Sequence, residues 1–257
     1  MPSRGLAVIG CAIVVACSAC FEQSVPETLL CGPALDPCPQ GSICNERGTC
    51  ADPATLPRTC AMTGTKLLAD NFQSYPIGTW NVTAPWHRVF SVRPEEIAII
   101  DDPDQPGNQA VGLRGVESNA ISSMLTFQDV DFTVRVRLLR VDTLVAIDFD
   151  HQDPPSPVTT NRVAIRTTGW NFEHKPANQT AVQLSPPAAP VFALNEWHLV
   201  RIQQVGTDLT FYRCDETSAM WQLLGTAIDS MFPGPGFVGF ATVNADADFD
   251  ELAAYVP

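Results

Sequence analysis

Cysteine is the residue whose number and spacing in this sequence predict the most definite chemistry. The chain has nine cysteines among 257 residues, and eight of them lie within the first 60. Such a density is typical of disulfide bonds in an oxidising compartment or of thiolates that bind a metal ion. The N-terminal segment helps to decide between the two, because it indicates the compartment in which the protein works.

Residues 1–20 have the pattern of an export signal. Arg4 is the only charged residue before Glu22. The apolar run over residues 5–16 is too short to span a bilayer, which needs about 20 residues. A short positive region followed by an apolar run and small residues predicts a secretory signal peptide.

The end of this segment contains a candidate lipidation site. Residues 14–17 (VVAC) resemble the lipobox of bacterial lipoproteins, so we expect acylation of Cys17 and attachment to a membrane through that lipid alone. Cys20 is the alternative, because its lipidation would leave an even set of six later cysteines. An ordinary cleaved signal peptide is the third interpretation. In each case the mature protein is exported to the periplasm or the cell surface.

Residues 21–59 are predicted to form a tether, a small cysteine-rich module and a linker. Cys31, Cys38, Cys44 and Cys50 are separated by six, five and five residues. About twenty residues cannot build a hydrophobic core, so two disulfides are expected to hold them. Of three possible pairings we favour 31–44 with 38–50. Zinc is the alternative, but no CxxC pair is present.

The last two cysteines belong to a larger domain predicted over residues 60–257. A stretch with two prolines, residues 51–59, reads as a stiff linker before it. Cys60 opens the domain, and Cys214 is the only cysteine far downstream. We expect a disulfide between them that ties the first segment of the domain to a late strand.

The charge of the chain excludes one class of partner. The net charge is −13, and the only lysines are Lys66 and Lys175. Nucleic acid binding needs a basic surface that releases counterions, so a nucleic acid partner is not expected. An acidic surface suits divalent cations but names no partner.

From about residue 66 onward the pattern is that of an all-β domain. Residues 130–140 alternate apolar and polar side chains, and residues 141–150 continue the alternation. About a dozen such runs are separated by turn residues, with prolines between the runs. This pattern predicts a two-sheet antiparallel β-sandwich.

Four short motifs lie along the predicted β domain. They are LADNF with a later Gly78 and Trp80, DFDHQDP at 148–154, NEWH at 195–198 with Gly206 and Leu209, and FVGF at 237–240 with FDEL at 249–252. Together they resemble the concanavalin A-like lectin/glucanase superfamily, in its 3-keto-disaccharide hydrolase-like branch. They occur in the family's order and at similar spacing, and the resemblance implies a jelly-roll sandwich over about residues 66–256.

The resemblance implies a candidate catalytic row. Family-sixteen glucanases carry Glu-x-Asp-x-x-Glu on one strand, which places a nucleophile and an acid/base about 5–5.5 Å apart. This chain has Asp148, Asp150 and Asp153 at the same spacing, and the first two would share a strand face. Neither end residue is Glu, and Asp153 precedes two prolines. Solvation of a strand end or contact with a cation is the alternative role.

The resemblance also implies a structural calcium ion where the first and last strands of the sandwich meet. Asp70 and Asp250 occupy such positions. Oxygen ligands suit Ca²⁺, and the acidic balance of the chain agrees with it. Ordinary exposed carboxylates are the alternative.

A sugar-binding face is the third expectation. Carbohydrate sites combine aromatic platforms with polar groups, although such rings can equally belong to a core. The candidate rings and donors are Trp86, His87, Trp170, Phe172, His174, Arg135, Arg137 and Arg166.

The sequence therefore favours an envelope lipoprotein whose sandwich is non-catalytic and binds a glycan or mediates surface contact. A glycoside-cleaving enzyme is the second hypothesis, based on the aspartate row. A structural envelope protein without a ligand is the third.

Overall fold

The computed structural model describes residues 43–44, 50–51, 60–91, 93–152, 159–230 and 235–257. The chain divides into two units, residues 1–56 and 57–257. In the first unit the described residues form β1 (Ile43–Cys44) and β2 (Cys50–Ala51), which pair antiparallel. Lipidation at Cys17 or Cys20 falls on residues outside the described ones. The same holds for Cys31 and Cys38, so the disulfides of the module stay predictions.

The second unit is built almost entirely of strands, and all pairings between its described strands are antiparallel. One short 3-10 helix, η1 (Pro94–Glu96), lies among them. The strands are β3 (Thr65–Asp70), β4 (Gly78–Thr79), β5 (Trp86–Ser91), β6 (Ile97–Asp101), β7 (Gln109–Leu113), β8 (Ser118–Phe127), β9 (Val130–Gln152), β10 (Thr159–Arg166), β11 (Gly169–Lys175), β12 (Val182–Gln183), β13 (Trp197–Val205), β14 (Asp208–Asp215), β15 (Met220–Ile228) and β16 (Gly236–Val256).

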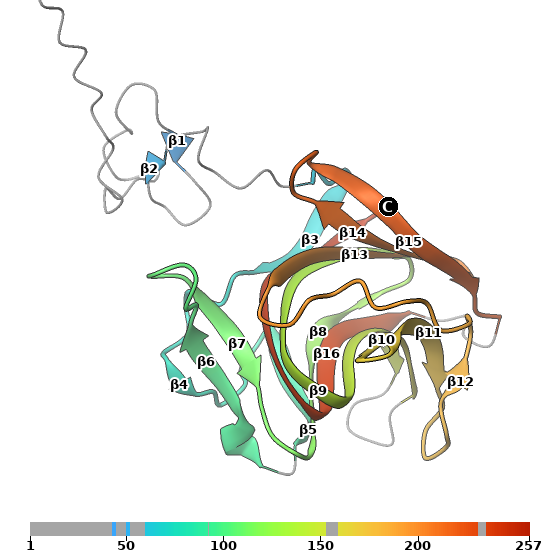
Figure 1. Cartoon of the computed structure of the whole chain (residues 1–257), viewed down its shortest axis with the longest axis horizontal. Coiled ribbons are helices and arrows are strands. Elements are labelled where there is room, and N and C mark those ends of the chain that lie inside the picture. Colours follow the sequence, from blue (N-terminus) through green and yellow to red (C-terminus); the bar gives the residue numbers. More distant parts are fainter. Residues whose placement is uncertain (1–42, 45–49, 52–59, 92, 153–158, 231–234) are drawn as a thin grey trace, which may run out of the picture. The chain divides into compact units, whose positions relative to one another are not determined.

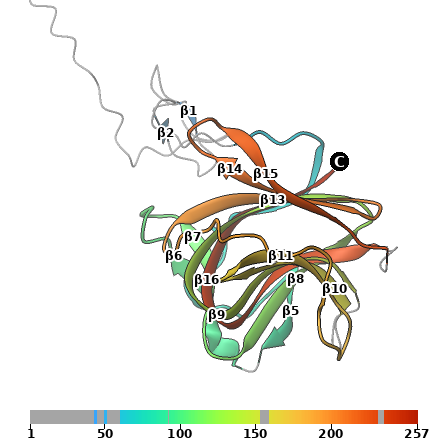
Figure 2. The same ribbon diagram turned by 45° about the vertical axis from the view of Figure 1, so that its right-hand side comes forward.

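Two long strands, β9 and β16, belong to both layers of a sandwich (Figure 1). The first half of β9 and the last part of β16 form a six-stranded sheet in the order β3-β16-β9-β13-β14-β15. The other halves form a seven-stranded sheet in the order β5-β8-β16-β9-β10-β11-β12. Figure 2 shows β13, β14 and β15 in one layer and β8, β10 and β11 in the other.

Register shifts explain how one strand can pass from sheet to sheet. The pairing of β16 with β9 is irregular between Val243 and Ala245, between Asp246 and Ala247, and beyond Asp250. Bulges of this kind bend a strand and increase its twist. Between its two ends, β16 also pairs with β7, which carries the short strands β6 and β4 beside it.

The core lies between the two sheets. Phe132, Val134 and Val136 point into it from the first half of β9, and Ile147 and Phe149 from the second half. Burial of such side chains contributes about 1.5–3 kcal/mol each relative to exposure. The all-β, two-sheet antiparallel sandwich predicted from the sequence is confirmed. The alternation over residues 130–150 lies within one continuous strand, β9.

A covalent bond fixes the start of the second unit. Cys60 and Cys214 form the predicted disulfide, with their Cα atoms 5.7 Å apart. The indole Nε1 of Trp221 donates to the backbone oxygen of Ala61 at 3.0 Å beside it. Within the described parts of the chain, no helix is long and apolar enough to cross a membrane.

Candidate functional site

The aromatic residues predicted to stack on a sugar lie in the core instead. Trp86, Trp170 and Phe172 are only 1, 4 and 0% exposed. Trp86 donates through Nε1 to Asp70 at 2.7 Å, and the rings of Trp170 and Phe172 pack edge-on against Phe211. A buried ring has no free face for a ligand, so the prediction is wrong for these three residues. Hydrophobic burial outweighed their suitability for sugar binding.

His174 is also unavailable to a ligand. Its side chain is buried on the core side of β11, where Nδ1 lies 3.0 Å from the Asn161 side-chain oxygen and 3.3 Å from Asp229. Its predicted role in sugar binding is therefore wrong too.

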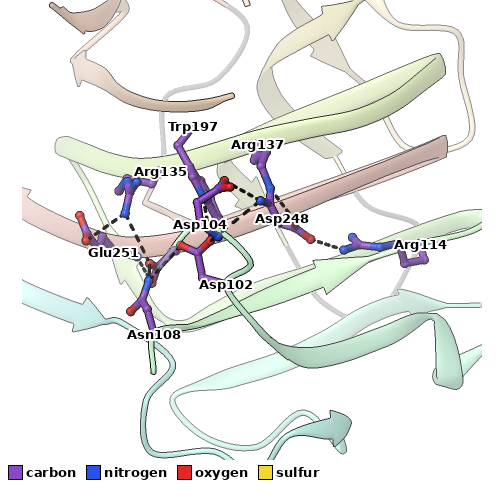
Figure 3. Close-up of polar contacts among 10 residues, drawn as sticks. Asp102, Asp104, Asn108, Arg114, Arg135, Arg137, Trp197, Asp248 and Glu251 are labelled. Carbon is purple, nitrogen blue, oxygen red and sulfur yellow. Dashed lines mark hydrogen bonds and ion pairs between the residues drawn. The ribbon is translucent and has the colours of Figure 1, made fainter. Parts of the chain in front are cut away.

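Arg135 and Arg137 were predicted as sugar donors and instead enclose an indole ring. Their guanidinium groups lie 4.9 and 5.0 Å from the ring of Trp197, which comes from the neighbouring strand β13. Arg137 donates twice to Asp248, at 2.9 and 2.5 Å, and once to Asp104 at 2.8 Å. Figure 3 shows these contacts on the outside of the six-stranded sheet.

The same cluster accounts for Asp250. Its carboxylate accepts from the Asn108 side chain at 2.8 Å and from the Glu251 backbone at 2.7 Å. Burial raises its pKa to about 7, although the bond from Asn108 acts in the opposite direction. Trp197 donates to Asp102 at 3.2 Å, so the cluster fastens the loop between β6 and β7 to the sheet. Its donors and acceptors serve one another, which identifies a structural network.

The predicted calcium ligands do not form a metal site in the described part of the chain. Both oxygens of Asp70 are used: Oδ1 accepts from the Phe72 backbone at 2.8 Å, and Oδ2 from Tyr75 at 2.8 Å and Trp86 at 2.7 Å. Among the described residues there is no group of three or more His, Cys, Asp or Glu placed to hold a metal ion. The expected pair therefore serves as local anchors of loops and strands.

A different arrangement lies on the seven-stranded sheet, on the face directed away from the core. Val145, Ile147 and Phe149 of β9 point into the core, so the residues between them point the other way. Residues directly opposite in paired strands share a face. The register therefore aligns one row across all seven strands, here called the polar row: His87, Ser122, Gly239, Asp148, Arg162, Glu173 and Gln183.

Asp148 lies at the centre of the polar row and has an incomplete set of partners. The residue is 6% exposed, and its Oδ1 has no hydrogen-bond partner in the described structure. Burial raises the pKa of Asp148 to about 6, although Arg162 and Thr160 act to lower it. Of the predicted catalytic row, the side chain of Asp150 and the whole of Asp153 lie outside the description, so that row stays a prediction.

His87 occupies one end of the polar row. Burial lowers the pKa of its imidazole, so the ring is neutral at physiological pH. Its Nε2 is buried and, like Asp148 Oδ1, has no partner among the described atoms. A buried polar atom without a partner costs about 1–3 kcal/mol unless a ligand or a water supplies the missing bond.

Arginines hold the other end of the polar row. Arg162 donates to Glu173 through Nε at 2.9 Å and Nη2 at 2.7 Å. Arg166 donates to Glu173 at 2.5 Å and to Asn171 at 2.8 Å. Burial alone would raise the pKa of Glu173, but the two guanidinium groups outweigh it and hold the pKa below the ordinary value. Glu173 is therefore a fixed negative charge.

A second row lies beside the polar row and is here called the alanine row, because four of its six residues are alanines. Its members are Phe90, Ala120, Ala241, Ala146, Ala164 and Asn171, aligned across six strands by the same pairings. Ala146 and Ala164 pack with Leu144, apart from the main core. Phe90, at the edge strand β5, is 44% exposed. Ala146 and Ala164 are themselves 0% exposed, so the accessible apolar group of this row is the Phe90 ring at its edge.

Sequence reasoning found part of this face. Asp148, His87 and Arg166 were among the predicted residues, whereas Arg162, Glu173 and Phe90 were missed. A signal for Arg162 and Glu173 was present in the hairpin 159–175. With a two-residue turn at Thr167 and Thr168, Arg166 pairs with Gly169, and each step back along the first strand matches one step forward along the second. That register places Arg162 opposite Glu173.

Comparison with known proteins identifies the fold. No protein-family model matches the sequence, and no curated protein matches it either. Carbohydrate binding module CBM66 from Bacillus subtilis aligns with a TM-score of 0.51 and 16% identity, over 67% of this chain and 96% of that chain. A Bacillus subtilis protein of unknown function with a galectin-like fold aligns with a TM-score of 0.51 and 12% identity, over 75% and 96%.

A third solved structure agrees with these two. The exoplasmic/lumenal domain of VIP36, in a form bound to Ca²⁺ and Man3GlcNAc, aligns with a TM-score of 0.50 and 9% identity, over 67% of this chain and 84% of that chain. The sandwich therefore has the concanavalin A-like lectin/glucanase fold that the motifs suggested. Identities this low establish the fold alone, because one fold supports many functions.

Proposed function

We propose that the protein binds a carbohydrate on the outer face of its seven-stranded sheet. The observation that carries the proposal is Asp148, a buried carboxyl at the centre of the polar row with one oxygen lacking a partner. Buried polar groups are nearly always hydrogen-bonded, so an unused acceptor at a residue of this kind points to a ligand donor. A sugar hydroxyl is such a donor.

The rest of the face has the chemistry that a saccharide needs. A sugar ring has hydroxyl groups around its edge and C–H groups on its faces. The polar row carries Arg162, His87 and Asp148 as partners for hydroxyl groups. Phe90 supplies an exposed ring for stacking. Solved structures of the same fold include a carbohydrate binding module and a VIP36 domain in a form bound to Ca²⁺ and Man3GlcNAc, which supports the proposal.

Glycoside cleavage is the second candidate function, and one observation favours it. A carboxyl whose pKa is raised to about 6 is suited to act as a general acid near neutral pH. Its nearest described carboxylate in the polar row is Glu173, two strands away or about 10 Å along the sheet. Glu173 is held by two arginines, which makes it a weak base. Binding is therefore the first proposal. The resemblance to the 3-keto-disaccharide hydrolase-like branch would support cleavage, the second proposal.

The protein's place in the cell is also a proposal. The N-terminal motif supports an exported lipoprotein attached to a membrane through Cys17, or through Cys20, and facing the periplasm or the cell surface. The cysteine-rich module would separate the sandwich from the lipid. A structural calcium ion stays a prediction with no ligand set to support it.

Binding to a glycan array, followed by calorimetry on each hit, tests the first proposal. The full chain, purified in detergent, should bind at least one glycan, and Phe90→Ala should weaken that binding about tenfold by removing the stacking ring. Leu223→Ala, an exposed apolar residue on the six-stranded sheet, is the matched control and should bind normally. Release of new reducing ends would favour cleavage. An array without any hit would overturn the proposal and leave a structural role.

A further inference from the structure

The edge strand β15 (Met220–Ile228) lacks most of the features that protect the edge of a sheet. It ends the six-stranded sheet, and among the described strands it pairs only with β14. An edge strand leaves one row of backbone N–H and C=O groups unpaired, and proteins usually block that row with charges, prolines, bulges or very short strands. The sequence of β15, MWQLLGTAI, has no charged residue and no proline. Its single protective feature is a bulge at Leu224.

The other edge strands in the described part of the chain are better protected. β3, at the far edge of the six-stranded sheet, carries Lys66 and Asp70, and β5, at one edge of the seven-stranded sheet, carries Arg88. β4 and β12 have only two residues each. Nine consecutive uncharged residues are therefore a particular property of β15, in a chain whose net charge is −13.

Several apolar side chains of β15 are exposed to solvent. Met220, Leu223 and Ile228 are 67, 56 and 68% exposed, whereas Leu224 and Ala227 pack against the core. An uncharged strand that combines apolar side chains with unpaired backbone groups favours pairing with another strand. Burial of its exposed side chains would add to the stability of such a pair.

We infer that β15 pairs antiparallel with β15 of a second copy, so that two six-stranded sheets join into one sheet of twelve strands across a two-fold axis. Charge favours this partner. Two copies with a net charge of −13 each repel one another over most of their surfaces, whereas β15 brings no charge to its own symmetry mate. The inference does not depend on carbohydrate binding, because the polar row lies on the other sheet.

The bulge determines how the two strands would align. Phe211 points into the core, so its neighbours along β14 point outward, together with their partners on β15, Leu223 and Thr226. Residues opposite one another in paired strands share a face. Pairing over residues 221–228 of both copies keeps the outward and inward residues matched throughout. It places Leu223 of one copy beside Thr226 of the other.

Sedimentation of the full chain in density-matched detergent measures the association. The original protein should sediment as a dimer that dissociates on dilution. A chain with both Leu223→Lys and Thr226→Lys should have a dissociation constant about tenfold higher or more, because like charges opposite one another repel. A chain with both Leu223→Glu and Thr226→Glu should lose the dimer in the same way. Leu67→Lys, at a 49% exposed position on the other edge strand β3, is the matched control and should keep the dimer.

A mixture of the two double variants shows whether the strands pair directly. Each variant alone should be monomeric, whereas the mixture should form a dimer of one lysine chain and one glutamate chain, since opposite charges then lie beside one another. An unfolded variant could not be rescued in this way. Rescue therefore distinguishes the loss of pairing from the loss of the fold, and circular dichroism of each variant checks the fold independently.

Three results would overturn the inference. The first is an original protein that stays monomeric at every concentration. The second is a dimer that both double variants retain, because another surface would then hold it. The third is a mixture that stays monomeric although both variants are folded. Each of these results leaves the proposed carbohydrate binding untouched, since the glycan array tests the seven-stranded sheet.

Discussion

Two buried aspartates on adjacent strands show how partners decide the state of a carboxyl group. Asp248 on β16 receives two bonds from Arg137 and one from Arg114, so its negative charge is matched inside the protein. Asp148 on β9 is nearly as buried but has one oxygen without a described partner. A buried charge is tolerated when it is paired and hydrogen-bonded. The charge of Asp248 is thus compensated, whereas the charged form of Asp148 lowers the stability of the folded state.

Replacement of Asp148 by asparagine should therefore stabilise the protein at neutral pH. Its pKa in the folded state is about 6 against 3.8 for the free group, so the folded state holds the proton more tightly than the unfolded state. Ionisation of Asp148 therefore lowers the free energy of unfolding. This loss is absent below about pH 4, grows as the pH rises and is complete above about pH 6, where it amounts to about 3 kcal/mol at most.

Urea unfolding between pH 4 and pH 8 measures this effect. Asp148→Asn should match the original protein at pH 4 and exceed its free energy of unfolding by about 1–3 kcal/mol at pH 8. Asp208→Asn, an exposed residue of β14, is the control and should leave the pH profile unchanged. A destabilised Asp148→Asn at pH 8 would mean that the charged carboxylate has a partner after all. The same variant should bind the glycan less tightly, which is the mark of a residue retained for function.

At the scale of elements, β9 and β16 decide the architecture because each is shared between the two sheets. In β16, Gly239 lies beside one of the register shifts and in close contact with β8. A Cβ atom at Gly239 would lie 2.2 Å from the backbone oxygen of Ile121 and 2.9 Å from the Cα of Ser122. Only glycine allows β16 and β8 to approach this closely.

Gly239→Ala should consequently push β16 away from β8 and lower the free energy of unfolding by about 1–3 kcal/mol. It should also weaken glycan binding, because Gly239 joins Ser122 to Asp148 in the polar row. Gly112→Ala is the comparison, because the nearest atoms to its added Cβ are those of the Arg114 guanidinium at 3.0 Å, a side-chain end rather than backbone. That guanidinium also donates to Asp248, so a smaller loss than for Gly239→Ala is expected rather than none. Equal urea midpoints for the two variants would contradict this account of the contact.

The same elements show what the sequence could and could not predict. Alternation in residues 130–150 predicted the strands and the sandwich, since burial of every second residue is visible in one segment. Register between distant strands is not visible there, so the alignment of His87, Ser122 and Asp148 could not be foreseen. Aromatic residues were misplaced for a related reason: Trp170 suits both a core and a sugar platform, and only its neighbours decide.

At the scale of the whole molecule, the proposed lipid anchor would keep the sandwich at the cell envelope. Attachment matters to such a function, because a tethered protein stays beside its glycan even when each contact is weak. The N-terminal lipid is therefore as testable a part of the proposal as the sandwich.

Substitution of the candidate lipidation sites tests the anchor directly. In a bacterial host fed a labelled fatty acid, the full chain should be labelled and recovered with the membranes, since two or more acyl chains hold a protein there stably. Cys17→Ser should abolish labelling and leave a larger, unprocessed chain, whereas Cys20→Ser should keep both label and membrane location. The reverse result would assign the lipid to Cys20 and leave an even set of six later cysteines for disulfides. Release of the unlabelled, shortened original protein into the soluble fraction would contradict lipidation altogether and leave an ordinary secreted protein with the same sandwich.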